Sequence, residues 1–181
     1  LGEMTKAQVR AEAGRLGLSM AHKKDSQEIC FVGKDYRDFL ARHIPEAISA
    51  GDLVDSAGTV VGRHAGLPLY TIGQRSGLNL ARPERSYVVA MQPKANRIVV
   101  GQDGDLLCDS LRVRQAAFNV TPPAKALAAK IRSHGQLASC RLSRDGDVVD
   151  VRFDEPQRAV SPGQIIVFYD GEVVVGGGII D

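Results

Sequence analysis

Cys30 is the candidate for covalent chemistry in this chain, because a thiolate is a strong nucleophile and Lys23 and Lys24 lie near it in the sequence. It belongs to the run Asp25-Ser26-Gln27-Glu28-Ile29-Cys30-Phe31-Val32-Gly33. If the apolar part of this run is a strand, the thiol faces away from Ile29 and Phe31. Free cysteine is also among the most often buried residue types, so an inert core thiol is the alternative, and spacing alone favours it.

Three polar segments are candidates for binding. Gly73-Gln74-Arg75-Ser76-Gly77 places an amide and a guanidinium between glycines, which suits phosphate or base-edge contacts, although an exposed hairpin turn explains it equally well. Lys130 and Arg132 stand two residues apart, so they would share one face of a strand and could follow an RNA backbone. Gln164 either contacts a ligand through its polar side chain or is an ordinary turn residue.

The positive charge is concentrated in one stretch, although the formal net charge is only +2. Between Leu111 and Arg144 there is no Asp or Glu, and the cations are Arg112, Arg114, Lys125, Lys130, Arg132, Arg141 and Arg144. A stretch of one sign attracts polyanions such as nucleic acids. A solvated face balanced by acids elsewhere in the fold is an equally good interpretation.

The remaining composition excludes several classes of protein. The three cysteines show no C-x-x-C spacing, which argues against a disulfide scaffold or a zinc site, favours a reducing cytoplasmic setting, and predicts structural roles for Cys108 and Cys140. The four histidines show no metal spacing. No apolar run approaches the roughly 18 residues that span a membrane, and no secretory signal is visible. Because the chain starts without Met, we expect it to be part of a longer protein.

These residues must be positioned by elements that are mostly strands. Thr5 and Gln8 form a capping box for a helix that Gly17 ends, and a second helix over 36–44 ends at Pro45. Two hairpins follow, over 52–61 and 87–100, and the last third contains six short strand-like runs, two of them joined at Asp170-Gly171 by a predicted type I′ turn. Ala124 to Lys130 competes as a helical turn.

The predicted fold is therefore mainly β, with a short N-terminal α segment, a small β-rich central domain and a C-terminal β-barrel. We place the domains at 1–33, 34–104 and 105–181, with the last boundary where Gly, Asp and Cys replace the strand residues.

Several motifs that occur in a fixed order along the chain point to one protein family. The Cys30 run resembles the segment around the second catalytic cysteine of the tRNA-specific 2-thiouridylases. Four further segments agree with that family in the same order: 1–6, 66–78, 159–164 and 168–180 with its Gly176-Gly177-Gly178 run. The resemblance covers the whole chain.

The resemblance implies an enzyme that replaces the C2 oxygen of the wobble uridine of tRNA by sulfur. ATP adenylates that oxygen, and Cys30 would be the persulfide that delivers sulfur, loaded by a cysteine desulfurase or a sulfur-relay protein. Arg132, Ser133 and Gln164 match family positions that contact tRNA, although Ser133 replaces an aromatic residue. We add Lys130, Gln74 and Arg75 as further expected tRNA-binding residues.

The resemblance also implies what this chain does not contain. The family's Ser-Gly-Gly-x-Asp-Ser ATP loop and its first catalytic cysteine are not in the sequence, so we expect a C-terminal fragment that is inactive by itself and holds one half of a two-cysteine active site. Two rival hypotheses are a non-catalytic RNA-binding β module with a structural cysteine, and a cysteine-dependent transferase that acts on proteins or small thiols. The basic stretch argues against the second.

Overall fold

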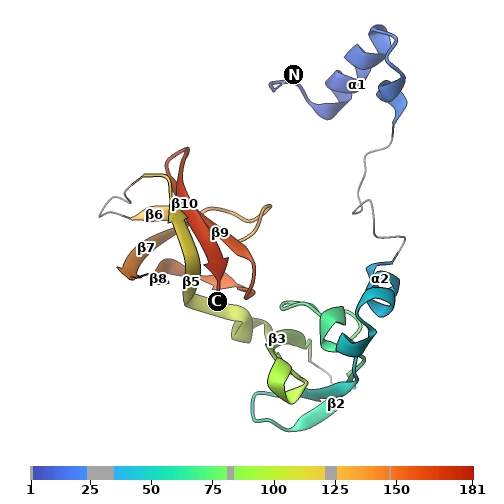
Figure 1. The fold of residues 1–181 in the computed structure, drawn as a ribbon, viewed down its shortest axis with the longest axis vertical. Coiled ribbons are helices and arrows are strands. Elements are labelled where there is room, and N and C mark those ends of the chain that lie inside the picture. Colours follow the sequence, from blue (N-terminus) through green and yellow to red (C-terminus); the bar gives the residue numbers. More distant parts are fainter. Residues whose placement is uncertain (1, 24–34, 81–83, 121–125, 147) are drawn as a thin grey trace. The chain divides into compact units, whose positions relative to one another are not determined.

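The computed structural model describes residues 2–23, 35–80, 84–120, 126–146 and 148–181, and these fall into two compact units, Leu1–Pro45 and Glu46–Asp181. Figure 1 shows the helices of the first unit and the sheet and barrel of the second. Cys30 lies outside the described residues. Within the described ranges, no helix combines the length and apolar character needed to cross a membrane.

The first unit contains two short α-helices, and the N-terminal cap of the first is the one that the sequence predicts. Helix α1 spans Lys6–Arg15 and α2 spans Tyr36–His43, with a 3-10 turn at Ser19–His22 after α1. The Thr5 amide donates to Gln8 Oε1 at 2.8 Å, and the Gln8 amide donates to Thr5 Oγ1 at 3.4 Å, which confirms the capping box. No residue of either helix is buried, so caps rather than packing define these helices.

The second unit begins with a four-stranded sheet. Its strands are β1 (Gly51–Val54), β2 (Val60–His64), β3 (Tyr87–Gln92) and β4 (Arg97–Gly101), in the order β2-β1-β4-β3. Both predicted hairpins are confirmed. The sequence did not indicate that β1 and β4 pair in parallel, which joins the two hairpins into one sheet over a core of Leu53, Leu78, Val88, Ile98 and Val100.

The rest of the second unit is a closed six-stranded barrel, as predicted. Its strands are β5 (Leu107–Phe118), β6 (Leu127–Lys130), β7 (Ala138–Asp145), β8 (Val148–Arg158), β9 (Ile165–Asp170) and β10 (Val173–Ile180), in the circular order β10-β5-β8-β7-β6-β9. Alternate residues such as Val149, Val151 and Phe153 point inward, and the Phe118 and Phe168 rings stack with centroids 5.9 Å apart. Closure pairs every barrel strand on both sides.

Two local predictions in the barrel are wrong. The expected helical turn before Lys130 is the strand β6, because Leu127 and Ala129 enter the barrel core and the strand pairs with both β7 and β9. Burial between two strands outweighs the helix propensity of an alanine-rich segment. The β9–β10 loop is Gly171-Glu172 between paired Asp170 and Val173, and only Gly171 has a positive φ, of 59°, so the turn is not type I′.

His64 is a buried polar residue that closes one end of the central sheet. It is 2% exposed; its Nε2 donates to the Asn96 carbonyl at 3.1 Å, and its ring meets Tyr70 edge-on at 5.9 Å. Asn96 is left-handed, with φ 48°, and its side-chain amide donates to Ser49 Oγ at 3.1 Å and the Ala50 carbonyl at 3.0 Å. Gly51, the first residue of β1, lies directly against the cluster formed by His64 and Asn96.

Gly51→Ala tests this packing. A Cβ at Gly51 would lie 2.1 Å from the Asn96 carbonyl oxygen and 2.5 Å from His64 Nε2, so the cluster would have to move. We expect a loss of about 2–3 kcal/mol in the free energy of unfolding, measured by urea denaturation. Gly104→Ala, where a Cβ meets nothing within 4 Å, is the control and should be near neutral. Equal stability of the two variants would contradict this account.

Candidate nucleic-acid interface

A hollow of about 610 Å³ on the barrel brings together two segments that lie about thirty residues apart in the sequence. One is the loop after β6, and the other is the start of β9. The residues that line it are Ile131, Arg132, Ser133, His134, Gly135, Gln164 and Ile165. Three predicted tRNA-binding residues, Arg132, Ser133 and Gln164, are thus placed in one site.

Arg132 is held by a backbone carbonyl. Its Nη2 donates to the carbonyl of Ala159, which also accepts a hydrogen bond from the buried Ser161 hydroxyl at 3.2 Å. The Gly135 amide donates to the Arg132 carbonyl at 3.0 Å and closes the loop. One end of the guanidinium is therefore fixed, while Arg132 as a whole is exposed and keeps further N–H donors for a ligand.

Ala159 has an unusual backbone that makes this anchor possible. It is 1% exposed with φ 54°, a left-handed conformation that costs a non-glycine residue about 1 kcal/mol or more. Its amide donates to the Leu106 carbonyl at 2.8 Å. Because both the amide and the carbonyl of Ala159 are bonded, the carbonyl points to a fixed place beside the Arg132 loop.

Gln164 is positioned by the strand next to it. The Gly163 amide donates to the Ile180 carbonyl, and the Ile180 amide donates to the Gln164 carbonyl, both at 2.8 Å. Gly163 has φ 84°, so the turn favours glycine there. The backbone of Gln164 is thus fixed to β10, and its exposed side chain lines the hollow.

Lys130 and the central loop differ from the expectation. Strand β6 ends at Lys130, so Lys130 and Arg132 do not share a strand, and Lys130 is half-buried outside the residues that line the hollow. The side-chain amide of Gln74 serves its own loop, because its Oε1 accepts from the Thr71 amide at 3.0 Å and its Nε2 donates to the Ser76 carbonyl at 2.9 Å. Arg75 is exposed.

The central loop nevertheless packs on the anchor of Arg132. Gly73 has φ 87°, and a Cβ there would lie 3.0 Å from the Ala159 Cβ and 3.8 Å from Arg158 Nη1. Glycine at this position allows the loop backbone to approach the barrel closely. The loop with Gln74 and Arg75 and the loop with Arg132 therefore both rest on the Arg158-Ala159 segment.

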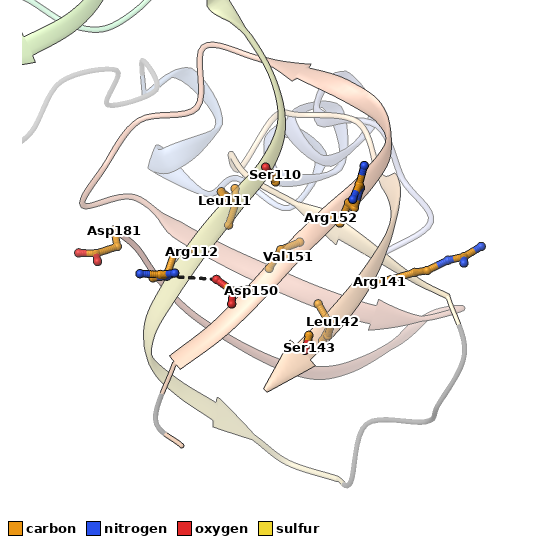
Figure 2. A pocket seen from close by; sticks show the side chains of 10 residues that line it. All are labelled: Ser110, Leu111, Arg112, Arg141, Leu142, Ser143, Asp150, Val151, Arg152 and Asp181. Atoms are coloured by element: carbon orange, nitrogen blue, oxygen red, sulfur yellow. Dashed lines mark hydrogen bonds and ion pairs between the residues drawn. The ribbon is translucent and has the colours of Figure 1, made fainter. Parts of the chain in front are cut away.

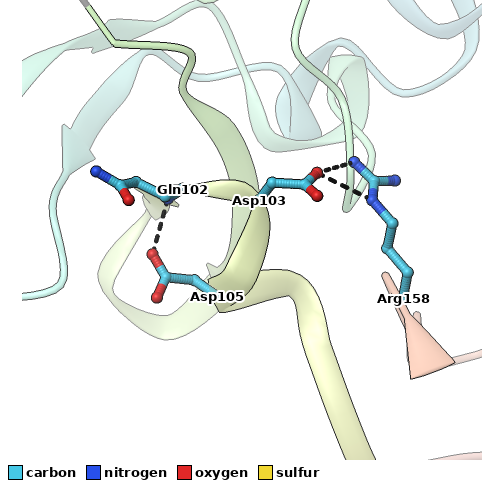
Figure 3. Close-up of polar contacts among 4 residues, drawn as sticks. All are labelled: Gln102, Asp103, Asp105 and Arg158. Carbon is cyan, nitrogen blue, oxygen red and sulfur yellow. Dashed lines mark hydrogen bonds and ion pairs between the residues drawn. The ribbon is translucent and has the colours of Figure 1, made fainter. Parts of the chain in front are cut away.

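An ion pair at Arg158 holds the same segment to the connection between sheet and barrel. Figure 3 shows the Arg158 guanidinium turned toward Asp103, with Nη2 at 2.7 Å and Nε at 3.1 Å from the same carboxylate oxygen. The guanidinium also lies 5.3 Å from the centroid of the Tyr87 ring. Asp103 begins a 3-10 turn in which Asp105 accepts from the Gln102 amide at 2.7 Å.

Of the two described cysteines, Cys140 has the surroundings of a structural residue. Cys140 is fully buried in the barrel core, and burial, with a smaller effect of Asp154, raises the pKa of its thiol to about 11. A thiol with that pKa is neutral and unreactive at physiological pH. Cys108 is half-buried, and its thiol donates to the Ser110 carbonyl. In the described ranges, no group of three His, Cys, Asp or Glu is placed to hold a metal ion.

Three family models match successive parts of the chain. Residues 1–34 match a tRNA methyl transferase HUP domain, residues 37–102 a tRNA methyl transferase PRC-barrel domain, and residues 108–180 an aminomethyltransferase β-barrel domain. The last two matches cover the sheet and the barrel described above.

Relatives named tRNA-specific 2-thiouridylase MnmA are similar along the whole chain. The protein of Roseiflexus sp. (strain RS-1) is 47% identical over 99% of this chain and 50% of its own length. Those of Symbiobacterium thermophilum and Moorella thermoacetica are each 44% identical over 100% of this chain, and over 48% and 52% of their own lengths. The chain belongs to the tRNA-specific 2-thiouridylase family. It spans about half the length of these curated relatives.

In this member of the 2-thiouridylase family, sequence reasoning missed four residues of the hollow: Ile131, His134, Gly135 and Ile165. Two of them, His134 and Ile165, have exposed side chains. His134 is exposed beside Ser133, and Ile165 is 65% exposed beside Gln164. His134 was passed over because no histidine has metal spacing, yet an imidazole is also a ring that can stack on a base. Ile165 begins a strand, and only the structure shows that its side chain stays outside the core.

The pKa of Cys140 predicts a pH dependence of stability. The folded chain holds the proton of the Cys140 thiol more tightly than the unfolded chain. The contribution of this proton to the free energy of unfolding is therefore complete below about pH 9 and is lost as the pH rises toward 11. Between these values, we expect the free energy of unfolding to fall by about 2 kcal/mol more in the wild type than in Cys140→Ala. Cys108→Ala is the control and should keep the wild-type slope. Parallel curves for wild type and Cys140→Ala would contradict the assignment.

Proposed function

We propose that this chain is the sulfur-carrying and tRNA-binding part of an enzyme that thiolates C2 of the wobble uridine of tRNA. The observation that carries the proposal is the hollow in which Arg132, Ser133 and Gln164 lie together on the barrel of a 2-thiouridylase family member. The division into segments 1–33, 34–104 and 105–181 is part of this proposal, with tRNA binding assigned to the last two.

The chemistry of the hollow supports contacts with single-stranded RNA. Arg132 is anchored through one nitrogen, so its remaining donors can hold a phosphate or a base edge in a fixed orientation. The Gln164 amide offers both a donor and an acceptor, as base recognition needs. His134 and the exposed Ile165 supply faces on which an unstacked base can rest, where Ser133 supplies none.

The sulfur-carrying role is assigned to Cys30. It lies outside the described residues, so the assignment rests on its sequence motif and on the family. A persulfide on Cys30 offers a soft outer sulfur as the nucleophile toward the activated C2, and the adenylated oxygen leaves as AMP. The family's other catalytic cysteine would then attack the Cys30 sulfur, which breaks the persulfide S–S bond, leaves the outer sulfur on C2 and forms a disulfide between the two cysteines. A cysteine desulfurase or a sulfur-relay protein would supply the sulfur.

ATP is the expected co-substrate of the family. At the start of α1, the described helix in the stretch that matches a HUP-domain model, the Thr5 and Gln8 amides are bonded within the capping box. We therefore assign no step through the nucleotide to the described residues. We propose that this chain alone does not thiolate tRNA.

A non-catalytic RNA-binding module is the second candidate function. It is favoured by the same hollow and by the inert state of Cys140, which is buried in the barrel core. The two functions differ only in what Cys30 does.

Cys30→Ser separates them. In the full-length protein, loaded by a cysteine desulfurase with labelled sulfur, we expect a persulfide by mass spectrometry in the wild type and none in Cys30→Ser. Thiolation should be abolished, while tRNA affinity changes less than two-fold, because serine keeps the size of the side chain but cannot form a persulfide. Cys140→Ser is the matched control and should keep the persulfide. A persulfide and normal thiolation in Cys30→Ser would leave only the RNA-binding module.

Arg132→Ala tests the hollow. It removes the guanidinium and its anchor to Ala159, and we expect tRNA affinity to fall by about 5- to 30-fold, or about 1–2 kcal/mol, in a filter-binding titration. Arg132→Lys keeps the charge but not the planar fork, so it should recover only part of the loss. Arg97→Ala removes an exposed arginine of β4 and is the control for charge alone. An equal loss in Arg97→Ala and Arg132→Ala would contradict the site.

A further inference from the structure

The outer face of the barrel carries a second basic groove, distinct from the hollow at Arg132. It has a volume of about 800 Å³ and runs across β5, β8 and β7 (Figure 2). The residues that line it are Ser110, Leu111, Arg112, Arg141, Leu142, Ser143, Asp150, Val151, Arg152 and Asp181. The groove shares no residue with the hollow.

Register places two arginines of this groove directly opposite each other. Arg141 on β7 is the cross-strand partner of Arg152 on β8, and Arg152 in turn is the partner of Ser110 on β5. Both arginines are exposed, on the face opposite to the buried Cys140, Val151 and Phe153. Like charges opposite each other on one face of a sheet destabilise the pair unless something lies between them.

The two carboxylates that line the groove, Asp150 and Asp181, are matched to other cations. Arg112 Nε lies 3.1 Å from Asp150 Oδ1, and Arg114 Nε lies 3.5 Å from Asp181 Oδ1. For Arg141 and Arg152, the described part of the chain provides no carboxylate within 4.0 Å. Figure 2 shows Arg112 turned toward Asp150, while Arg141 and Arg152 project from neighbouring strands in different directions. The surplus positive charge of the groove therefore lies at the Arg141–Arg152 pair.

We propose that Arg141 and Arg152 together bind the phosphodiester backbone of an RNA, with each guanidinium taking phosphate oxygens as the chain passes over the groove. The negative backbone offsets the like-charge repulsion of the pair, and guanidiniums suit phosphate oxygens because they offer pairs of parallel N–H donors. RNA fits better than an isolated phosphate, because the groove is open and crosses three strands, which suits a chain that continues past the pair. The inference rests on the proposed function for the identity of the RNA as tRNA.

The test is a salt titration of tRNA binding by this 181-residue chain. We expect the double variant Arg141→Gln/Arg152→Gln to bind tRNA about ten-fold more weakly at about 0.1 M salt, and its slope of log affinity against log salt to be smaller by about one. Arg144→Gln removes a charge from the same strand, where the guanidinium donates to the Gly146 carbonyl at 2.9 Å, and it should change affinity by less than two-fold.

A second measurement checks that the site takes phosphate. Inorganic phosphate should raise the midpoint of thermal unfolding of the wild type more than potassium chloride does at equal ionic strength. This excess should be smaller in the double variant, which keeps only the general stabilisation that phosphate gives as an excluded salt. Without phosphate, the double variant should melt no lower than the wild type, because it loses a repulsive pair.

Three results would overturn the inference. The first is an unchanged salt slope in the double variant, and the second is an equal loss of tRNA affinity in Arg144→Gln. The third is normal tRNA binding combined with slower sulfur loading of the full-length double variant, which would make the groove a protein-docking surface. Failure of the proposed function is distinguishable from failure of this inference. It would appear as normal thiolation in Cys30→Ser, whereas RNA binding by the groove is decided by the salt slope of the double variant.

Discussion

The backbone of Ala159 is the point at which the binding loop of the barrel, the link from the sheet and the central loop meet. Its carbonyl anchors Arg132 and accepts from Ser161, its amide bonds to Leu106, and its side chain lies against the backbone at Gly73. A left-handed alanine costs free energy, so the surrounding bonds must hold it in place. In return, one residue fixes the binding loop of the barrel, the link from the sheet and the loop of the central domain.

This arrangement explains how a small barrel can present an ordered binding loop. The loop after β6 contains no strand or helix, yet its arginine is fixed by a backbone whose own position is set by β8 and the 3-10 turn before β5. The Arg158–Asp103 ion pair is exposed and by itself contributes little to the free energy of unfolding. It does, however, hold Arg158, the residue before Ala159, to the connection between sheet and barrel. Order in the loop therefore comes from tertiary contacts.

The arginines of the barrel divide into three kinds by their partners. Arg112 and Arg114 are paired with carboxylates, so the interpretation of a solvated, balanced face holds for them. Arg132 is bonded to a carbonyl, and Arg141 and Arg152 are cross-strand partners on β7 and β8. The basic stretch is one feature in the sequence but separates into different surfaces in the barrel, because successive strands carry their outward residues to different sides.

The sequence by itself determined the helix caps at Thr5, both hairpins of the central sheet, the closed barrel and the family, because these depend on local periodicity, turn residues and short motifs. It could not determine the parallel pairing of β1 with β4, the strand at Leu127–Lys130 or the buried His64, since each depends on partners far away in the chain. The same holds for the site. The motifs named Arg132 and Gln164 separately, but only the fold placed them in one hollow, added His134 and Ile165, and set Arg152 opposite Arg141, because cross-strand register is a property of the folded sheet and not of the local sequence.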